Sequence, residues 1–464
     1  MTTLTEIGSW LADALPSLIE RGHVPAASVA VLSDGHIASA AAGVLNTTTG
    51  VQATTDSLFQ IGSITKVWTA TLIMQLVDEE LLDLDAPVQS VLPDFALADE
   101  SAAAAITVRQ LLSHTAGFEG DFFTDTGTGD DCVEKYVRTL SDTPQLFAPG
   151  EQFSYNNAAF VVLGRIVEVL RGTPYDQILR QRLIDPLGLH HVATDAAQAI
   201  MFRAAVGHVP AEGSDRPVPA PMWSLVRSNT PAGAMLSMTA QDLLGFARLH
   251  IDNGVTPEGS RLLSASAAQQ MQHPETAVPE LSLMGKNWGL GWSLYDWPGG
   301  PVIGHDGGTI GQAAFLRVVP EKGIAVAILT NGGMPFELYS TVMTHVMAEL
   351  ADVAVPALPA PEDPLPALHD ASRYLGTYSS SVADSTVRQD DDGRIWLDQA
   401  MKGIFADLGP DPAPVELVPW HTDALITRTA DKGVHISHAF VGDDGTGKAQ
   451  YLHTGRADRR ITSG

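Results

Sequence analysis

The spacing of apolar residues predicts both helices and strands in the first half of the chain. Apolar positions recur every three or four residues over 5–21, which predicts a helix with one apolar face. Two apolar runs, 26–32 and 37–44, flank an Asp-Gly pair, a pattern typical of a β-hairpin. A long amphipathic helix is predicted directly after Ser63. The remaining predicted helices of this half cover 161–170, 175–183 and 240–250.

Strand-like segments return later in the chain. Apolar runs over 313–319 and 324–329 are separated by a turn, and a helix is predicted over 335–351. Strands therefore open and close this region, while helices fill its middle. This order predicts an α+β fold in which the terminal segments build one sheet.

The composition changes at 356–366, where five of 11 residues are proline. Such a stretch is stiff and extended, so we expect a linker over 353–369 between one domain at 1–352 and another at 370–464. Turns rich in Asp and Gly separate short β-rich segments in the second domain, which predicts a small antiparallel barrel or sandwich. These segments cover 394–397, 415–418, 424–428, 434–441 and 449–453.

The charge balance argues against several classes of partner. The 464 residues include 27 Lys plus Arg and 54 Asp plus Glu, a formal net charge of −27, so we expect no binding to nucleic acid or anionic lipid. No run of 18 apolar residues predicts a membrane span. The first residues lack the pattern of a secretory signal. Cys132 is the only cysteine, which excludes an intrachain disulfide and a Cys-based zinc site. Together these features favour a cytoplasmic protein.

The clearest chemical feature is Ser63 followed by Lys66 at the head of the long predicted helix. Residues three apart share a helix face, so the amine should lie beside the hydroxyl. A serine becomes a nucleophile when a base takes its proton, and a lysine can be that base if burial lowers its pKa. The helix N-terminus would favour the alkoxide. The alternative interpretation is a capping serine followed by a surface lysine.

Two further segments carry candidate groups. Tyr155 and Asn157 stand at the entry to a predicted helix, where the hydroxyl could relay a proton and the amide could bind a substrate carbonyl or hold the lysine. Later, His305, Gly307 and Gly308 precede the last strands of the first domain. Glycines at a strand edge admit a substrate backbone, and a free N–H there can complete an oxyanion hole with the serine N–H. A turn with a packed tyrosine and a glycine-rich loop with an incidental histidine are the alternatives.

The order of these motifs resembles a known family. S-x-x-K early, Y-x-N in the middle and H-x-G late form the three-motif layout of the serine penicillin-recognising enzymes, and the Y-x-N form resembles their class C branch. The resemblance covers about residues 5–350 and implies an antiparallel sheet flanked by helices, with a helical subdomain. Segments that resemble this branch are Leu84–Val88, Leu92-Pro93, Ile106–Phe118, Pro186–Leu189, Pro231–Gly233 and Gly289–Trp292.

The resemblance implies a mechanism without a cofactor or metal ion. Ser63 would attack an acyl carbonyl while Lys66 and Tyr155 manage the proton. The N–H groups of Ser63 and Gly308 would hold the oxyanion, and Tyr155 would help to protonate the leaving group and later activate the acceptor. His114 is interpreted as structural.

One departure from the β-lactamases of this branch concerns the third motif, which starts with His305 where they have a lysine. A histidine is a hydrogen-bond donor and is largely neutral near pH 7, so strong β-lactamase activity is not expected. Chain length and the appended β-domain are similar to the penicillin-binding-protein-type thioesterases, which release nonribosomal peptides from a carrier protein by head-to-tail cyclisation. This similarity implies a peptidyl thioester with a C-terminal D-residue as donor, the peptide's own amine as acceptor, and a lipocalin-like domain that covers the active site.

If the C-terminal domain covers the site, its tail should contribute to the pocket. Arg456, Arg459 and Arg460 are conspicuous in so acidic a chain, and one of them could meet a substrate carboxylate or the carrier protein. Trp223 and Trp288 are candidates for lining an acyl pocket. A solvated basic tail and ordinary core packing are the alternatives for these two groups.

Several other functions remain open. An esterase or D-aminopeptidase would use the same serine, lysine and tyrosine with water as acceptor, and a tailoring acyltransferase would use an external amine or alcohol. A non-catalytic binding module of this fold would be expected to lose a motif residue, and none is lost. A metalloenzyme is disfavoured because the His190-His191 pair lacks an H-E-x-x-H helix.

Overall fold

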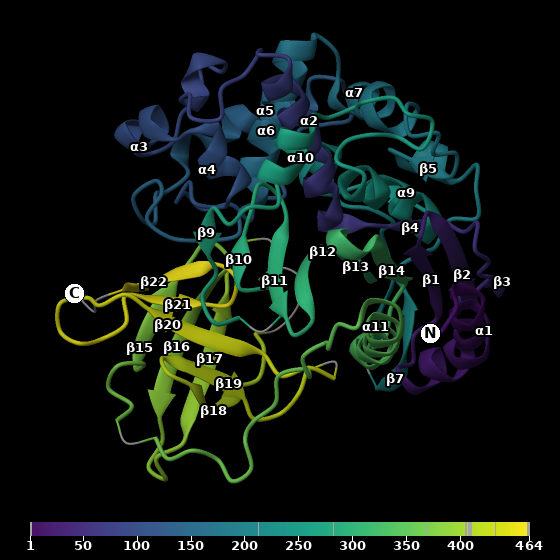
Figure 1. Ribbon diagram of the computed structural model, residues 1–464. Coiled ribbons are helices and arrows are strands. Elements are labelled where there is room, and N and C mark those ends of the chain that lie inside the picture. Colours follow the sequence, from purple (N-terminus) through teal and green to yellow (C-terminus); the bar gives the residue numbers. More distant parts are fainter. Residues whose placement is uncertain are drawn as a thin grey trace.

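The computed structural model describes residues 2–211, 213–281, 283–368, 370–403, 406, 411–431 and 433–461. Within these residues, the largest sheet is antiparallel and has nine strands in the order β3-β2-β1-β14-β13-β12-β11-β10-β9 (Figure 1). Its centre joins β1 from the start of the chain to β14, which lies nearly 300 residues later, as the sequence predicts. The strands are β1 Ala26–Ser33, β2 His36–Asn46, β3 Val51–Gln52, β9 Thr276–Ala277, β10 Asn287–Trp288, β11 Ser293–Trp297, β12 Gly300–Thr309, β13 Gln312–Val319 and β14 Ile324–Thr330.

The hairpin of β1 and β2 forms where the sequence predicts it. Ser33 pairs with His36, and the two residues between them have positive φ angles of 49° at Asp34 and 77° at Gly35. Such angles suit the tight turn that matches the twist of antiparallel strands, and Asp and Gly adopt them readily.

Helices cover both faces of the large sheet. The outer face packs against α1 (Leu4–Arg21) and α11 (Phe336–Ala351), and the inner face packs against a larger helical region that includes α2 (Thr65–Asp78) and α9 (Ala240–Ile251) (Figure 1). The other helices are α3 Glu100–Ala105, α4 Val108–Leu112, α5 Cys132–Arg138, α6 Asn157–Arg171, α7 Tyr175–Leu179, α8 Ala196–Ala199 and α10 Ala265–Gln270. Small sheets are formed by β4 Phe59–Gln60, β5 Val192–Ala193 and β8 Ser237–Met238, and by β6 His208–Ala211 and β7 Ser214–Pro219.

The expectation of an amphipathic helix after Ser63 is wrong. Every residue of α2 from Thr65 to Leu76 is buried. The helix lies between the sheet and the surrounding helices, so it has no solvent-facing side, and its polar side chains must find internal partners. This placement matters for Lys66, which is carried into the interior.

The C-terminal strands form a closed barrel. Within the described part of the chain, eight antiparallel strands run in sequence order, and the first pairs with the last. This resolves the choice between a barrel and a sandwich, and is consistent with a lipocalin-like domain. The division of the chain at 352 and 370 stays a prediction. The strands are β15 Gly376–Ser379, β16 Ala383–Gln389, β17 Ile395–Met401, β18 Val415–His421, β19 Ala424–Thr427, β20 Ser437–Val441, β21 Tyr451–His453 and β22 Ala457–Ile461.

The turn between β21 and β22 connects the barrel to the helical region. His453 Nδ1 accepts the Gly455 N–H, so its Nε2 donates to the Phe153 carbonyl at 2.8 Å. The Tyr155 N–H donates to the Gly455 carbonyl at 2.9 Å, and the Ala457 N–H donates to Ser154 Oγ at 3.1 Å. The barrel is therefore hydrogen-bonded to the segment that carries the second sequence motif.

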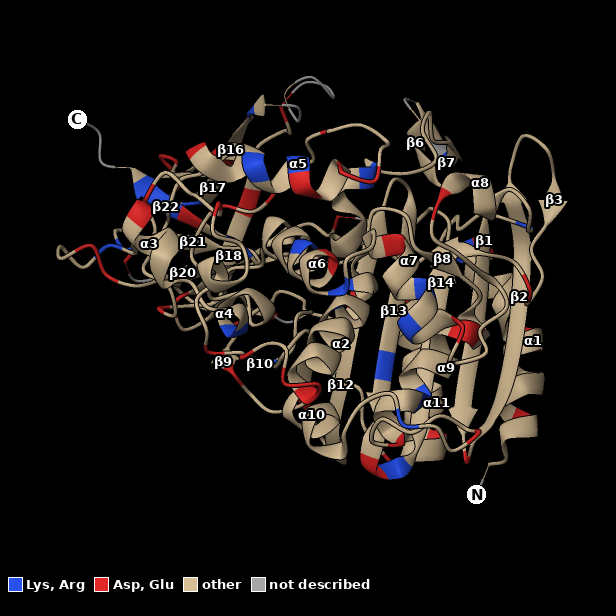
Figure 2. Cartoon of the chain, turned by 90° about the horizontal axis from the view of Figure 1, so that it is seen from above, with Lys and Arg blue, Asp and Glu red and all other residues tan. Residues whose placement is uncertain are grey.

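Charged side chains lie mostly outside the layered interior, where the strands and α2 are largely tan (Figure 2). Among the helices that the structure describes, none has the length and apolar character needed to cross a membrane.

Candidate active site

Ser63 and Lys66 lie side by side at the start of α2. Ser63 belongs to a short 3₁₀ turn, Gly62–Ile64, and Lys66 to the first turn of the helix that follows. Lys66 Nζ lies 3.1 Å from Ser63 Oγ, and it donates to Asn157 Oδ1 at 2.7 Å and to the Ala232 carbonyl at 2.6 Å. A neutral amine has two N–H donors and one lone pair. The two acceptors use the donors, which leaves the lone pair for the serine hydroxyl.

Electrostatics favour this neutral amine. Lys66 is completely buried, and burial is the main reason why its pKa lies well below the ordinary value. The nearby positive charge of Arg456 lowers the pKa further, while Asp121 opposes the shift. The hydrogen-bond partners of the amine are uncharged oxygens. This arrangement can let the lysine act as a base toward Ser63.

Tyr155 borders the same space. Its ring lies 4.9 Å from Lys66 Nζ and 4.8 Å from the Arg456 guanidinium carbon, measured to the ring centroid. Burial raises its pKa above the ordinary value, although contacts with Ser63 and Arg456 oppose that change. The phenol therefore keeps its proton near neutral pH and can donate it to a leaving group.

His114 supports the tyrosine segment, in line with its structural interpretation. Its Nδ1 accepts the Asn156 N–H at 2.9 Å, and its carbonyl accepts the Ser154 N–H at 2.8 Å. Its ring lies tilted against the Tyr155 ring, with centroids 4.3 Å apart. Burial, followed by the charges around Lys66, holds the pKa of His114 well below its ordinary value, so it is neutral.

A polar chain connects the site to the barrel, and sequence reasoning missed its central member. Asn157 Nδ2 donates to Asp121 Oδ1 at 2.6 Å, and Arg456 Nε donates to Asp121 Oδ2 at 2.7 Å. Arg456 belongs to the turn between β21 and β22. The guanidinium predicted to meet a substrate carboxylate is thus already paired with Asp121. An acidic residue directly after Gly120 in a loop beside the first two motifs was the available signal.

The third motif lies on β12 against the serine turn. A methyl group built on Gly307 would lie 1.9 Å from the Ile61 carbonyl oxygen, and one on Gly62 would lie 2.6 Å from the Gly308 nitrogen. Both positions therefore require glycine. This close approach brings the strand edge that carries the Gly308 N–H next to the turn that carries the Ser63 N–H.

His305 differs from the expected donor. Its Nδ1 donates to the Asp306 carbonyl at 2.6 Å, which leaves Nε2 as an acceptor without a partner among the described residues. Burial, followed by the charge at Lys66, lowers the pKa of His305 to about 3. The ring is therefore neutral and offers a lone pair beside Tyr155 and Trp288.

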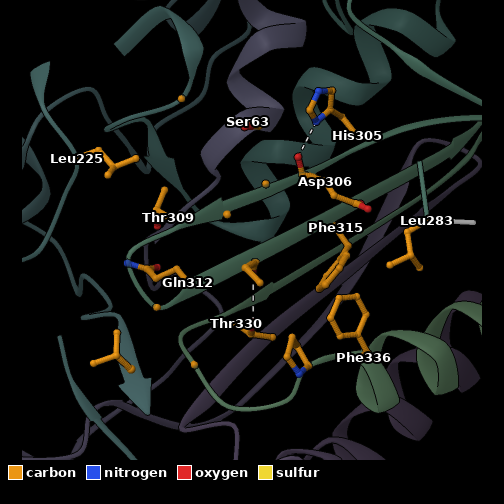
Figure 3. A pocket seen from close by; sticks show the side chains of 18 of the residues that line it. Ser63, Leu225, Leu283, His305, Asp306, Thr309, Gln312, Phe315, Thr330 and Phe336 are labelled. Carbon is orange, nitrogen blue, oxygen red and sulfur yellow. Dashed lines mark hydrogen bonds between the residues drawn. The ribbon is translucent and has the colours of Figure 1, made fainter. Parts of the chain in front are cut away.

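These groups open into a cavity of about 910 Å³, parts of which Figure 3 shows. Of the predicted residues, Ser63, Tyr155, Asn157, His305, Gly307, Gly308, Trp288 and Arg456 line it, and Lys66 lies directly behind Ser63.

Three predicted recognition residues, all in the described part of the chain, are outside that lining. Arg459 is exposed on β22, and Arg460 donates to the carbonyls of Ala449 and Leu375 within the barrel. Trp223 packs elsewhere and donates to the Ala205 carbonyl. Exposed Arg459 matches the alternative of a solvated basic tail, Trp223 matches ordinary packing, and Arg460 is held within the barrel.

A half-buried serine and a buried lysine beside a tyrosine and a glycine-lined strand edge are typical of enzymes that transfer acyl groups through a serine. The sequence profile of the β-lactamase family matches residues 11–341. Penicillin-binding protein 4 of Amycolatopsis lactamdurans is 47% identical over 359 residues, which are 77% of this chain and 93% of that protein. The chain therefore belongs to the β-lactamase and penicillin-binding-protein superfamily of serine hydrolase-type enzymes, as the motifs indicate.

Other relatives extend the comparison. The crystal structure of SurE superimposes with a TM-score of 0.77 and 28% identity over 98% of this chain and 99% of that one, so the likeness includes the barrel. The unguisins hydrolase ungD' of Aspergillus campestris is 25% identical over 74% of this chain and 65% of its own length. A D-amino acid amidase from Ochrobactrum anthropi has a TM-score of 0.59 and 23% identity over 71% of this chain and 92% of that one, which supports the fold alone.

Proposed function

We propose that the protein is a serine acyltransferase that forms an acyl ester on Ser63 and releases a nonribosomal peptide from its thioester carrier by head-to-tail cyclisation. The observation that carries the proposal is the buried, neutral Lys66 beside Ser63 in a large cavity that the barrel borders through Arg456.

The first half of the reaction follows from the contacts of Ser63. Its oxygen attacks the thioester carbonyl, and its proton passes to the Lys66 lone pair. The oxyanion is held by the N–H groups of Ser63 and Gly308. The C–S bond then breaks, and the thiol leaves with a proton supplied through Tyr155, which keeps its O–H at neutral pH.

The second half uses the same groups in reverse. The peptide's own amine attacks the acyl ester, loses a proton to the Lys66 and Tyr155 relay, and displaces the Ser63 oxygen, which regains its proton. One peptide bond forms, one ester bond breaks, and the resting site is restored. Asn157 holds the lysine in place throughout, since its carbonyl oxygen accepts from the amine.

Two comparisons bear on donor and acceptor. SurE has been solved with D-Leu, which fits a D-residue at the acyl end of the substrate. The relative named as a hydrolase favours a second candidate, in which water accepts the acyl group. A peptidyl carrier protein as partner and a cytoplasmic location stay predictions.

The test is incubation of a linear peptidyl thioester with a C-terminal D-residue, followed by mass spectrometry of protein and products. We expect a macrocycle and an acyl adduct with the wild type, and neither with Ser63→Ala. Ser90→Ala is the matched control, because Ser90 also lies in a 3₁₀ turn but is exposed and outside the cavity lining. If the product is a linear acid and its formation depends on Ser63, the proposed reaction is hydrolysis instead of cyclisation. Turnover by Ser63→Ala would refute the acyl-serine mechanism.

A further inference from the structure

The cavity continues beyond the reactive serine. From Ser63 its lining passes over the edge of β12 at Gly308 and Thr309 and reaches Phe315 and Phe336, which lie beyond that strand (Figure 3). Phe315 belongs to the cluster between the sheet and α1 and α11. We call this part the outer lobe, and its apolar walls are Leu283, Ala313, Phe315, Met334 and Phe336.

Small residues form the floor of the outer lobe and leave open space above it. Gly308 pairs with Ala313, and Asp306 pairs with Phe315, so these four positions share one face of the sheet. A methyl group built on Gly308 would meet no described atom within 4 Å. Gly307, its neighbour, points to the opposite face, where the same addition would strike Ile61. The two adjacent glycines therefore have different consequences, a close approach on one face and open space on the other.

The walls suit an aromatic ring. Phe315 and Phe336 meet edge to face with centroids 5.9 Å apart, and Met334 is 38% exposed beside them. Rings and thioethers pack well against a further ring. At the end of the lobe, Asp306 accepts from Arg317, yet 35% of its side chain is exposed, and each carboxylate oxygen keeps a second lone pair.

We propose that the outer lobe is a side-chain subsite for the peptide donor and binds an aromatic residue that lies N-terminal to the acyl residue, with tryptophan or tyrosine preferred over phenylalanine. The inference rests on the proposed function for its substrate. The β12 edge separates the lobe from Ser63, so the residue it binds is not the one whose carbonyl reacts. The polar N–H or O–H of the preferred rings would donate to Asp306.

Binding is measured first, so that the test does not depend on turnover. Linear peptide amides of alanine with a C-terminal D-Leu, in which one tryptophan is moved stepwise along the chain, are titrated by calorimetry into the Ser63→Ala protein. We expect one position at which tryptophan lowers Kd at least about tenfold relative to alanine, with a smaller gain for phenylalanine. Equal affinity for every position would overturn the subsite.

Variants of the outer lobe test whether the tryptophan preference arises there. In the same background, Phe336→Ala removes a wall and Ala313→Leu fills the floor, and each should reduce the tryptophan preference below threefold while the all-alanine peptide binds within twofold of its original Kd. Leu350→Ala is the matched control, since it truncates a half-buried residue of the same helix and cluster that does not line the cavity. The Leu350→Ala protein should keep its preference for the tryptophan peptide. A preference that survives both Phe336→Ala and Ala313→Leu would place the aromatic ring elsewhere.

The failure of each proposal has its own signature. Position-dependent tryptophan binding without cyclisation of the matching thioester by the wild-type protein keeps the subsite and rejects the cyclase. Cyclisation at equal kcat/KM for all peptides, together with equal Kd values, rejects the subsite and keeps the cyclase.

Discussion

Two regions of the interior each bury a basic side chain, with opposite results. Lys66 is completely buried and Arg317 is 2% exposed. The amine of Lys66 meets a hydroxyl, an amide oxygen and a backbone carbonyl. The guanidinium of Arg317, which gives β13 its blue segment in Figure 2, is held by both carboxylate oxygens of Asp306 at 2.5 and 3.0 Å and faces the Tyr295 ring.

The partners help to shift the two pKa values in opposite directions, and an arginine in any case holds its proton far more firmly than a lysine does. Burial lowers the pKa of both side chains. For Arg317 burial is the largest single effect and lowers the pKa, but Asp306 together with the nearby Tyr295 and Tyr339 outweighs it and holds the pKa well above the ordinary value. For Lys66 burial prevails, because its direct partners are uncharged. Burial alone therefore does not separate a base from a structural cation; the type of side chain and the charge of its direct partner act together.

The largest expected effect is the loss of the base itself. Lys66→Met removes the lone pair that faces Ser63 and keeps a side chain of similar length. We expect kcat/KM to fall about 10³–10⁴-fold, the upper range for a positioned general base. The rate of acyl-adduct formation measures it. A variant with more than a tenth of the wild-type rate would show that another group accepts the serine proton.

A carboxylate partner for Lys66, like the one that Arg317 has, should remove the difference between the pKa shifts of the two side chains. Asn157→Asp replaces the amide oxygen with a carboxylate at about the same place. The lysine pKa should rise, so the amine is protonated at neutral pH, and kcat/KM should fall on the order of 100-fold. The loss should shrink as the pH is raised. Asn156→Asp is the control, because Asn156 caps the same helix but does not contact the amine.

The converse change removes the carboxylate from the other region. Asp306→Asn leaves the buried Arg317 without a counter-charge. We expect a loss of about 2–3 kcal/mol in the free energy of unfolding, less than for a fully buried pair because Asp306 is partly exposed. Urea denaturation measures it. The double variant Asp306→Leu, Arg317→Met should recover much of the loss, and a single variant as stable as the wild type would contradict a stabilising pair.

Local patterns in the sequence predict much of this arrangement. The i, i+3 spacing of Ser63 and Lys66 is enough to place amine beside hydroxyl, and the Asp34-Gly35 turn is enough to predict the hairpin. The strands at 313–319 and 324–329 match β13 and β14 because both are largely buried and mostly apolar, with Arg317 as the one charged residue of 313–319. In each case the signal lies within a few residues of the structure that it predicts.

The remaining features depend on contacts between distant segments. The pKa of Lys66 is lowered in part by Arg456, and Arg456 is fixed by Asp121, 335 residues away in the chain. β22 was missed because its sequence, ADRRI, carries charges on a half-exposed strand and lacks a continuous apolar run. The orientation of the His305 ring depends on one hydrogen bond to the adjacent carbonyl, which spacing does not encode.

The smallest expected effects come from the two charges that flank Lys66 at a distance. Arg456 favours the neutral amine and Asp121 opposes it. The acid limb of kcat/KM should follow the lysine, since activity rises as the pH rises through its pKa. Arg456→Met should raise that pKa and move the limb to higher pH, whereas Asp121→Asn should lower it and move the limb to lower pH. His114 and His305 have lowered pKa values, so they stay neutral in this range.

The distinguishing result is that the two variants shift the acid limb of kcat/KM in opposite directions. Both variants break the same ion pair, so a purely structural role would shift or depress the two profiles alike. The shifts should be modest, because the Arg456 side chain is 42% exposed and solvent screens its charge. Arg456→Lys keeps the charge and should hold the limb nearer to its original position than Arg456→Met does. If the acid limbs of both variants move in the same direction, the barrel acts on Lys66 through packing. The different pKa shifts of Lys66 and Arg317 would then depend on their direct contacts alone.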